Sequence, residues 1–236
     1  MTGPLVTGPR GDGPDGDAAA PAWLARLAVA ARKMAVPPAM RPPPSGGRQS
    51  AVLILFGEGA AGPDVLLVQR SPWLRRHAGQ PAFPGGAIDA GDGGPVPAAL
   101  REAAEEALID PASVDVLTEL PELFINRSGF TVTPVLAWWR RPGPVAPGDP
   151  AEVTAVRRVP VADLASPANR LTIRYPDGRG GPAFRTAGML IWGFTGYIVD
   201  QLVALGGWEQ PWDAENVQAL PAEVLASRAR EAAPGS

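Results

Sequence analysis

The sequence predicts an α/β (α+β) domain in which a mixed β-sheet is sandwiched between helices. Short apolar runs with β-type composition recur along the middle of the chain, and two longer segments carry apolar residues at helical spacing. Strands and helices do not follow one another in strict βαβ order, and this arrangement favours a mixed sheet covered by helices.

The first part of the chain, residues 1–48, is expected to be a tail that holds one helix. Gly, Pro and Asp dominate residues 1–19, which leaves little to bury and predicts disorder. Apolar residues at helical spacing then predict a helix over about 20–36, and a Pro-rich linker ends it. The helix has one apolar face. It could dock on the main domain or serve an oligomer, so a homodimer stays open.

The main domain is expected over residues 49–207. Residues 51–56 and 64–69 are apolar runs joined by a Gly-rich turn, which is typical of an antiparallel pair. A helix is predicted over 96–108 and a closing helix over 191–205. Further strands are predicted at 114–120, 131–139, 153–159 and 171–175. Periodicity is lost from Gly206, and residues 208–236 are expected to be a polar C-terminal tail.

Composition excludes several classes of protein. The chain has 21 Lys and Arg against 24 Asp and Glu, with a net charge of -3 and no basic stripe, which argues against nucleic-acid binding. It has no cysteine, so disulfides, zinc–thiolate sites and thiol nucleophiles are excluded. The start lacks a signal peptide, and the longest apolar stretch, 191–205, is interrupted by glycines, Asp200 and Gln201. A soluble, cytoplasmic protein without a membrane span is expected.

The most informative stretch joins a Gly-Gly turn to an acidic helix. At about 100° per residue, Glu102, Glu105 and Glu106 share one helix face, and the small apolar residues lie on the other. Packed carboxylates repel each other, and a hard divalent cation such as Mg²⁺ or Mn²⁺ would offset that repulsion. A Glu-rich helix alone is more typical of a solvated face. Combined with Phe83-Pro84-Gly85-Gly86, whose glycines let a ligand approach the backbone, it predicts a metal–diphosphate site.

Residues Gly86 to Ile109 resemble the box of the Nudix family, G-x5-E-x7-R-E-U-x-E-E-x-G-U, where U is aliphatic. The matching residues are Gly86, Arg101, Glu102, Glu105 and Glu106. Three features depart from the pattern: Asp92 replaces the first Glu, the spacer before Arg101 has eight residues rather than seven, and Leu108 replaces the late Gly.

The segment upstream of the box resembles one subfamily. Residues 66–71, 74–80 and 82–86 follow the form LLTxRSxxLRxHxGQxAFPGG of the coenzyme A diphosphatases. That subfamily also tolerates the longer spacer and an Asp in place of the first Glu. The resemblance covers roughly residues 50–205, and it implies a Nudix fold and a small-molecule substrate. The implied reaction is hydrolysis of coenzyme A to 3′,5′-ADP and 4′-phosphopantetheine, with Mg²⁺ or Mn²⁺ as cofactor.

The resemblance also implies roles for single residues. Glu102 and Glu106 would be the principal metal ligands, and Glu105 a third ligand or the group that activates water. Gly86 could offer its carbonyl, with Gly85 beside it at the substrate. Arg101 is expected to orient Glu105 through an i,i+4 ion pair. Glu152, before a predicted strand, could be a further ligand or base, or simply a solvent-facing residue.

A cationic group precedes the box, formed by Arg70, Arg75, Arg76 and His77. Guanidinium groups pair well with phosphate oxygens, so Arg70 and Arg75 are assigned to substrate binding, whereas Arg76 could equally be solvated. His77 is expected either to contact substrate or to order the loop by a hydrogen bond. Trp138, Trp139 and Trp192 lie in strand or helix patterns and are expected in the core.

Two other functions stay open. A Nudix hydrolase could act on another nucleoside diphosphate derivative, such as ADP-ribose or NADH, and a substrate panel would separate these from coenzyme A. A Nudix fold could also serve as a binding module without catalysis. Only Leu108 supports the binding module, and the intact glutamates of the box argue against it.

Overall fold

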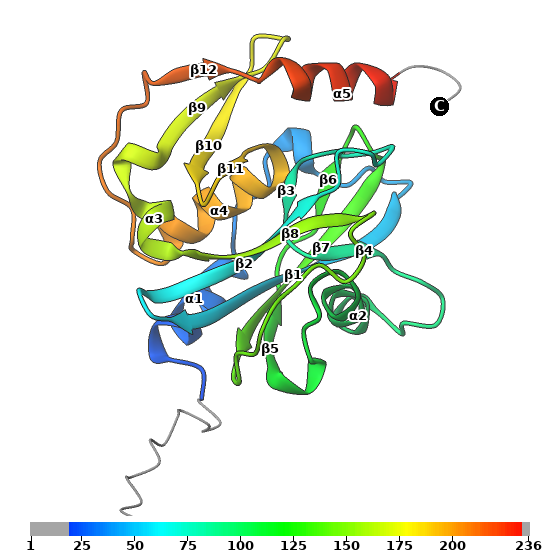
Figure 1. The fold of residues 1–236 in the computed structure, drawn as a ribbon, viewed down its shortest axis with the longest axis vertical. Coiled ribbons are helices and arrows are strands. Elements are labelled where there is room, and N and C mark those ends of the chain that lie inside the picture. Colours follow the sequence, from blue (N-terminus) through cyan, green and yellow to red (C-terminus); the bar gives the residue numbers. More distant parts are fainter. Residues whose placement is uncertain (1–18, 233–236) are drawn as a thin grey trace, which may run out of the picture.

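The computed structural model describes residues 19–232, and its main sheet is mixed (Figure 1). This eight-stranded sheet has the order β3-β2-β1-β7-β5, with β4 also paired to β1, β6 to β7 and β8 to β2. Strands β1 and β7 pair in parallel, and the other pairs are antiparallel. The strands are β1 (Arg48–Gly59), β2 (Gly62–Arg70), β3 (Pro81–Ala82), β4 (Gly85–Ala87), β5 (Val114–Glu119), β6 (Leu123–Ile125), β7 (Phe130–Trp139) and β8 (Val153–Pro160).

A second, four-stranded sheet has the order β11-β10-β9-β12. Its strands are β9 (Arg170–Arg174), β10 (Gly180–Thr186), β11 (Met189–Ile191) and β12 (Val217–Ala219). The helices are α1 (Ala22–Ala31), α2 (Pro95–Ala107), α3 (Val161–Ala165), α4 (Gly193–Leu205) and α5 (Ala222–Ala232), with 3₁₀ turns η1 (Pro38–Met40), η2 (Pro111–Ser113) and η3 (Pro167–Asn169). No helix within residues 19–232 is long and apolar enough to cross a bilayer.

Helices cover both faces of the main sheet, so the predicted α/β (α+β) class with a sandwiched mixed sheet is confirmed. Because successive side chains of a strand point to opposite faces, β1 sends Leu53 and Leu55 to one side and Ile54 and Phe56 to the other. The first pair packs against α2, and the second packs with α1 and α4. Burial on both faces explains why β1 reads as a continuous apolar run rather than an alternating one.

The N-terminal helix is docked, although it is shorter than the predicted 20–36. In α1, Leu24, Leu27 and Ala31 are buried in the core that α4 shares. Trp23 adds edge-to-face contacts to Phe56 and Trp208, with ring centroids 5.6 Å and 5.2 Å apart. The predicted disorder over 1–19 falls on residues outside the described range, except for Ala19.

The segment predicted as a polar C-terminal tail contains secondary structure that its sequence did not indicate. Residues 217–219 form β12 beside β9, and Ala222–Ala232 form α5, whose Val224 and Leu225 pack on a small core with Leu171 and Trp192. The closing helix predicted over 191–205 begins two residues later, at Gly193, because Ile191 is the last residue of β11. Short strands are held by backbone hydrogen bonds that any sequence can make, so they leave little periodic signal. The division of the chain into tail, domain and tail stays a prediction.

Candidate active site

Helix α2 presents the acidic residues because its opposite face is made of alanines. Ala98, Ala99, Ala103 and Ala107 are fully buried, so the helix lies close against β1 and β7. A left-handed residue ends the helix: Leu108 has φ 57°, its amide donates to the carbonyl of Ala104, and the amide of Ile109 donates to the carbonyl of Ala103. The family pattern has Gly here because glycine adopts this conformation without steric cost.

Glu106 is the most deeply buried of the box carboxylates, with 4% of its side chain exposed. It accepts hydrogen bonds from the backbone N–H of Gly85 at 3.1 Å and from Nη1 of Arg70 at 3.2 Å. Burial raises the pKa of Glu106 to about 7; Arg70 and the Gly85 N–H oppose the shift, and the charges of Glu102 and Glu152 add to it. A bound cation would stabilise the ionised form of this carboxylate, which burial and the neighbouring acidic charges disfavour.

Glu102 lies directly against the Gly-Gly turn. A β-carbon added to Gly86 would stand 2.3 Å from Oε1 of Glu102, so only glycine leaves this carboxylate in place. Burial is the main reason that the pKa of Glu102 is raised; Arg101 lowers it, and the charges of Glu105 and Glu152 raise it further.

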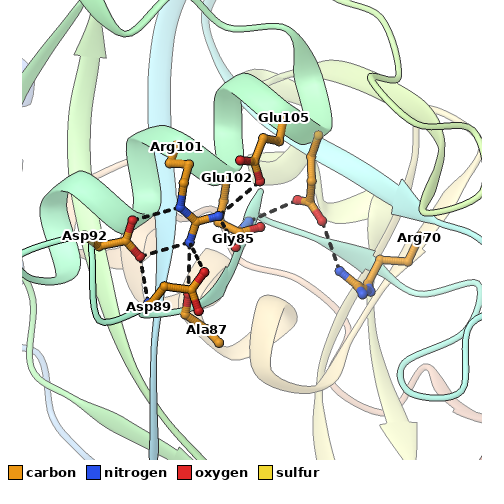
Figure 2. A network of polar contacts seen from close by, with 9 residues as sticks. Arg70, Gly85, Ala87, Asp89, Asp92, Arg101, Glu102 and Glu105 are labelled. Atoms are coloured by element: carbon orange, nitrogen blue, oxygen red, sulfur yellow. Dashed lines mark hydrogen bonds and ion pairs between the residues drawn. The ribbon is translucent and has the colours of Figure 1, made fainter.

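Arg101 is the hub of the surrounding ion pairs, as Figure 2 shows. It donates to Asp92 at 2.8 and 3.0 Å, to Glu102 at 2.9 Å and to Glu105 at 3.0 Å. A further bond of 3.2 Å reaches the carbonyl oxygen of Ala87. The Arg101–Glu105 pair predicted from the i,i+4 spacing is therefore present. Asp92, which replaces the first Glu of the box, has its pKa lowered to about 2, chiefly by the hydrogen bond from Arg101.

Glu152 is brought to the same place from a distant part of the sequence. Its carbonyl oxygen accepts a 2.7 Å hydrogen bond from the N–H of Ser71, the residue after β2. Its side chain is exposed, and its charge raises the pKa values of Glu102 and Glu106. Glu152 therefore belongs to the acidic cluster by position, and its role as ligand or base stays a prediction.

The carboxylate oxygens of the cluster are donors that suit a hard divalent cation, but in the described residues they do not converge on one point. Within residues 19–232, no three acidic or histidine side chains are gathered as a ready-made metal site. Glu105, with 60% of its side chain exposed, is turned to Arg101, and Glu106 is held by Arg70 and Gly85. Glu106 is buried and Glu102 half-buried, burial is the main reason that both pKa values are raised, and oxygen donors of this kind favour Mg²⁺ or Mn²⁺.

A cavity of ≈ 610 Å³ opens beside the cluster. All residues assigned from the sequence to substrate binding line it: Arg70, Arg75, His77, Gly85 and Gly86. Arg76 lines it too, with Nη1 3.5 Å from the carbonyl oxygen of Ser128. The roles of these residues remain predictions, but the structure brings them together around one cavity, and two of them, Arg70 and Gly85, contact Glu106.

Sequence reasoning missed the other walls. They come from β1, β7 and the start of α4, through Arg48, Phe130, Trp192, Phe194 and Thr195. Trp138, Trp139 and Trp192 are buried as predicted, yet Trp192 also borders the cavity. A signal existed, since residues 129–135 and 192–195 lie within the region of subfamily resemblance, but apolar patterns do not tell a core wall from a cavity wall.

Comparison with known proteins agrees with this geometry. The NUDIX domain profile matches residues 47–176. The chain is 51% identical over 94 residues to the "Uncharacterized Nudix hydrolase NudL" of Klebsiella aerogenes, covering 40% of this chain and 77% of that protein. It is 45% identical over 120 residues to the protein of that name from Escherichia coli, covering 49% and 58%. The aligned region thus spans little more than half of some relatives.

Two solved structures are similar to part of the chain. A Nudix hydrolase from M. smegmatis, RenU, is 29% identical over 55% of this chain and 83% of its own, with a TM-score of 0.43. The NUDIX domain of Shewanella oneidensis NrtR, solved with ADP ribose, is 24% identical over 52% and 80%, with a TM-score of 0.43. The profile match across more than half of the chain, together with the acidic helix on its Gly-Gly turn, places this protein in the Nudix hydrolase family.

Proposed function

We propose that this protein hydrolyses the diphosphate of coenzyme A, or of its derivatives, to 3′,5′-ADP and 4′-phosphopantetheine. The observation that carries the proposal is the position of the loop between β2 and β3. This loop holds the motif residues Ser71 to Gln80 and lines the cavity, and Arg70, directly before it, binds the carboxylate of Glu106.

The motif residues themselves determine the shape of that loop. The N–H of Arg70 donates to the carbonyl of Gln80, and the N–H of Gly79 donates to the carbonyl of Ser71, which closes the loop at its base. Gly79 has φ +65°, and the side-chain amide of Gln69 donates to its carbonyl. A motif that forms a compact, cation-bearing loop at the acidic cluster is expected to recognise an anionic substrate rather than only to stabilise the fold.

In the proposed reaction, water attacks one phosphorus of the diphosphate, and the bond from that phosphorus to the bridging oxygen breaks. Glu102 and Glu106 would hold Mg²⁺ or Mn²⁺, which supplies charge neutralisation at the phosphoryl oxygens when bound. Arg70 and Arg75 would pair with phosphate oxygens, where guanidinium groups bind well. Glu105 or Glu152 would accept the proton released by the attacking water.

The test is product analysis by mass after incubation with coenzyme A and Mn²⁺. Wild-type protein is expected to yield 3′,5′-ADP and 4′-phosphopantetheine. Glu106→Gln, which keeps the size of the side chain and removes its charge, is expected to lose this turnover. Glu119→Gln, the same change at an exposed residue of β5, is the matched control and should act like wild type. Intact coenzyme A with the wild type, beside turnover of ADP-ribose or NADH, would overturn the substrate assignment.

A further inference from the structure

The C-terminal helix α5 follows β12 of the second sheet, yet it contacts residues that line the cavity. Figure 1 shows α5 running from β12 across the ends of β6 and β7. One residue near its end, Glu231, makes the connection, and 7% of its side chain is exposed. Oε1 accepts the backbone N–H of His77 at 2.7 Å, and Oε2 accepts Nε of Arg127 at 2.9 Å.

The hydrogen bond to Glu231 holds His77 in a backbone conformation that a residue with a β-carbon rarely adopts. His77 has φ 55°, in the left-handed region that non-glycine residues rarely adopt. Such a conformation persists only where the surroundings hold it, and here the carboxylate of Glu231 binds the N–H of that residue. The side chains of Arg75, Arg76 and His77 line the cavity, so their direction depends on this backbone.

A second contact of α5 reaches another residue that lines the cavity. Arg228, three residues before Glu231, places its guanidinium over Trp192, at 5.3 Å from the ring centroid, and near Tyr175 at 5.8 Å. Trp192 borders the cavity. Arg127, in the loop after β6, donates to the carbonyl oxygen of Arg228 as well as to the carboxylate of Glu231. It therefore links the two residues of α5 that make these contacts. The last turns of α5 therefore bridge two walls of the cavity.

We propose that Glu231 is a positioning residue of the active site. It acts through His77, holding the Ser71–Gln80 loop so that the cationic side chains of the loop face the diphosphate of a bound nucleotide-type substrate. The identity of that substrate rests on the function proposed above, whereas the ordering of the loop does not. The last helix of the chain is accordingly part of the binding site and not a passive terminal cap.

The test compares Glu231→Ala with Glu223→Ala. Glu223 is exposed and lies in the first turn of α5, at the other end of the helix from Glu231. Backbone amide exchange should accelerate across residues 71–80 in Glu231→Ala and stay as in wild type in β1 and β7. The KM for the diphosphate substrate should rise about tenfold, as expected for the loss of a charge-assisted hydrogen bond, with kcat changed much less. Glu231→Gln keeps an oxygen that can accept the His77 N–H, so it should recover most of the exchange protection.

Two results would overturn the proposal. One is unchanged loop exchange and KM in Glu231→Ala. The other is accelerated exchange throughout β1 and β7, which would mean that Glu231 stabilises the whole fold. If coenzyme A is not hydrolysed even by the wild type, the proposed function fails while the exchange measurement still decides the role of Glu231.

Discussion

The backbone of Gly86 lies so close to Glu102 that a β-carbon there would stand 2.3 Å from Oε1 of the glutamate. The obstructing atoms are the far end of a flexible side chain, which can move away. Gly85 differs, because its added β-carbon would meet the backbone of β1, at 2.3 Å from the carbonyl oxygen of Ala51. The two adjacent glycines therefore have different roles. The missing β-carbon at Gly86 leaves room for the carboxylate of Glu102, and the missing β-carbon at Gly85 allows β4 to pair with β1.

Alanine substitutions should separate these two roles. Gly86→Ala is expected to displace Glu102 and reduce kcat by about a hundredfold, because metal and phosphate contacts tolerate little misplacement, with a small change in stability. Gly85→Ala is expected to lower the free energy of unfolding by about 2 kcal/mol through overpacking against β1. Gly91→Ala, where the added carbon meets open space, is the control. Kinetics and urea unfolding measure both effects, and a Gly86→Ala enzyme with normal kcat would contradict the assignment of Glu102.

Leu108 should be replaceable by glycine with a gain in stability. Its φ of 57° costs about 1 kcal/mol for a residue with a β-carbon, and its side chain is 56% exposed. Leu108→Gly is therefore expected to raise the free energy of unfolding by up to about 1 kcal/mol. Leu205→Gly, at the right-handed end of α4, is the control and should be destabilising. A loss of stability in Leu108→Gly would show that packing of Leu108 near Gly148 outweighs the backbone cost.

The Arg70–Glu106 pair should behave as a coupled unit. Arg70→Ala leaves the buried carboxylate of Glu106 with only the Gly85 N–H as a partner. At pH values above the raised pKa of Glu106, where this carboxylate is charged, the change is expected to lower the free energy of unfolding by about 2 kcal/mol. Glu106→Gln removes the charge that needs a partner, so adding it to Arg70→Ala should cost less than the sum of the single changes. Urea unfolding of the three variants measures the coupling, and strict additivity would argue that the pair contributes no interaction.

His77 should titrate below pH 6.5, its ordinary pKa, because burial disfavours the charged imidazolium. Glu231 partly opposes this shift, whereas Arg70 and Arg127 add to it. The unfolded chain then binds more protons at this residue than the folded one, so stability is lost as pH falls below 6.5. His77 is the only histidine, so its proton NMR signal is unambiguous.

The same signal tests the contact with α5. Removing the negative charge in Glu231→Gln is expected to lower the pKa of His77 further. Glu223→Gln, on the exposed part of α5, should leave it unchanged. An equal or higher pKa in Glu231→Gln would mean that the carboxylate does not act on the imidazole.

Several elements could be predicted because their signal is local. The burial of β1 on both faces leaves a continuous apolar run in the sequence, and the alanine face of α2 leaves a helical period. The i,i+4 spacing of Arg101 and Glu105 was enough to predict their ion pair. By contrast, β3, β4, β6 and β12 are two- or three-residue strands, too short to show any period.

The sequence by itself determined the family, the acidic helix and the cationic loop, since motif spacing and periodicity are properties of neighbouring residues. It did not predict how far Glu105 and Glu106 differ in side-chain exposure, 60% against 4%, because burial depends on which distant segments pack nearby. Only the tertiary structure brought Glu152 to the cluster and Glu231 to His77, 154 positions away along the chain. Contacts of that range leave no local pattern, because hydrogen bonds between remote segments form only once the strands and helices between them have packed.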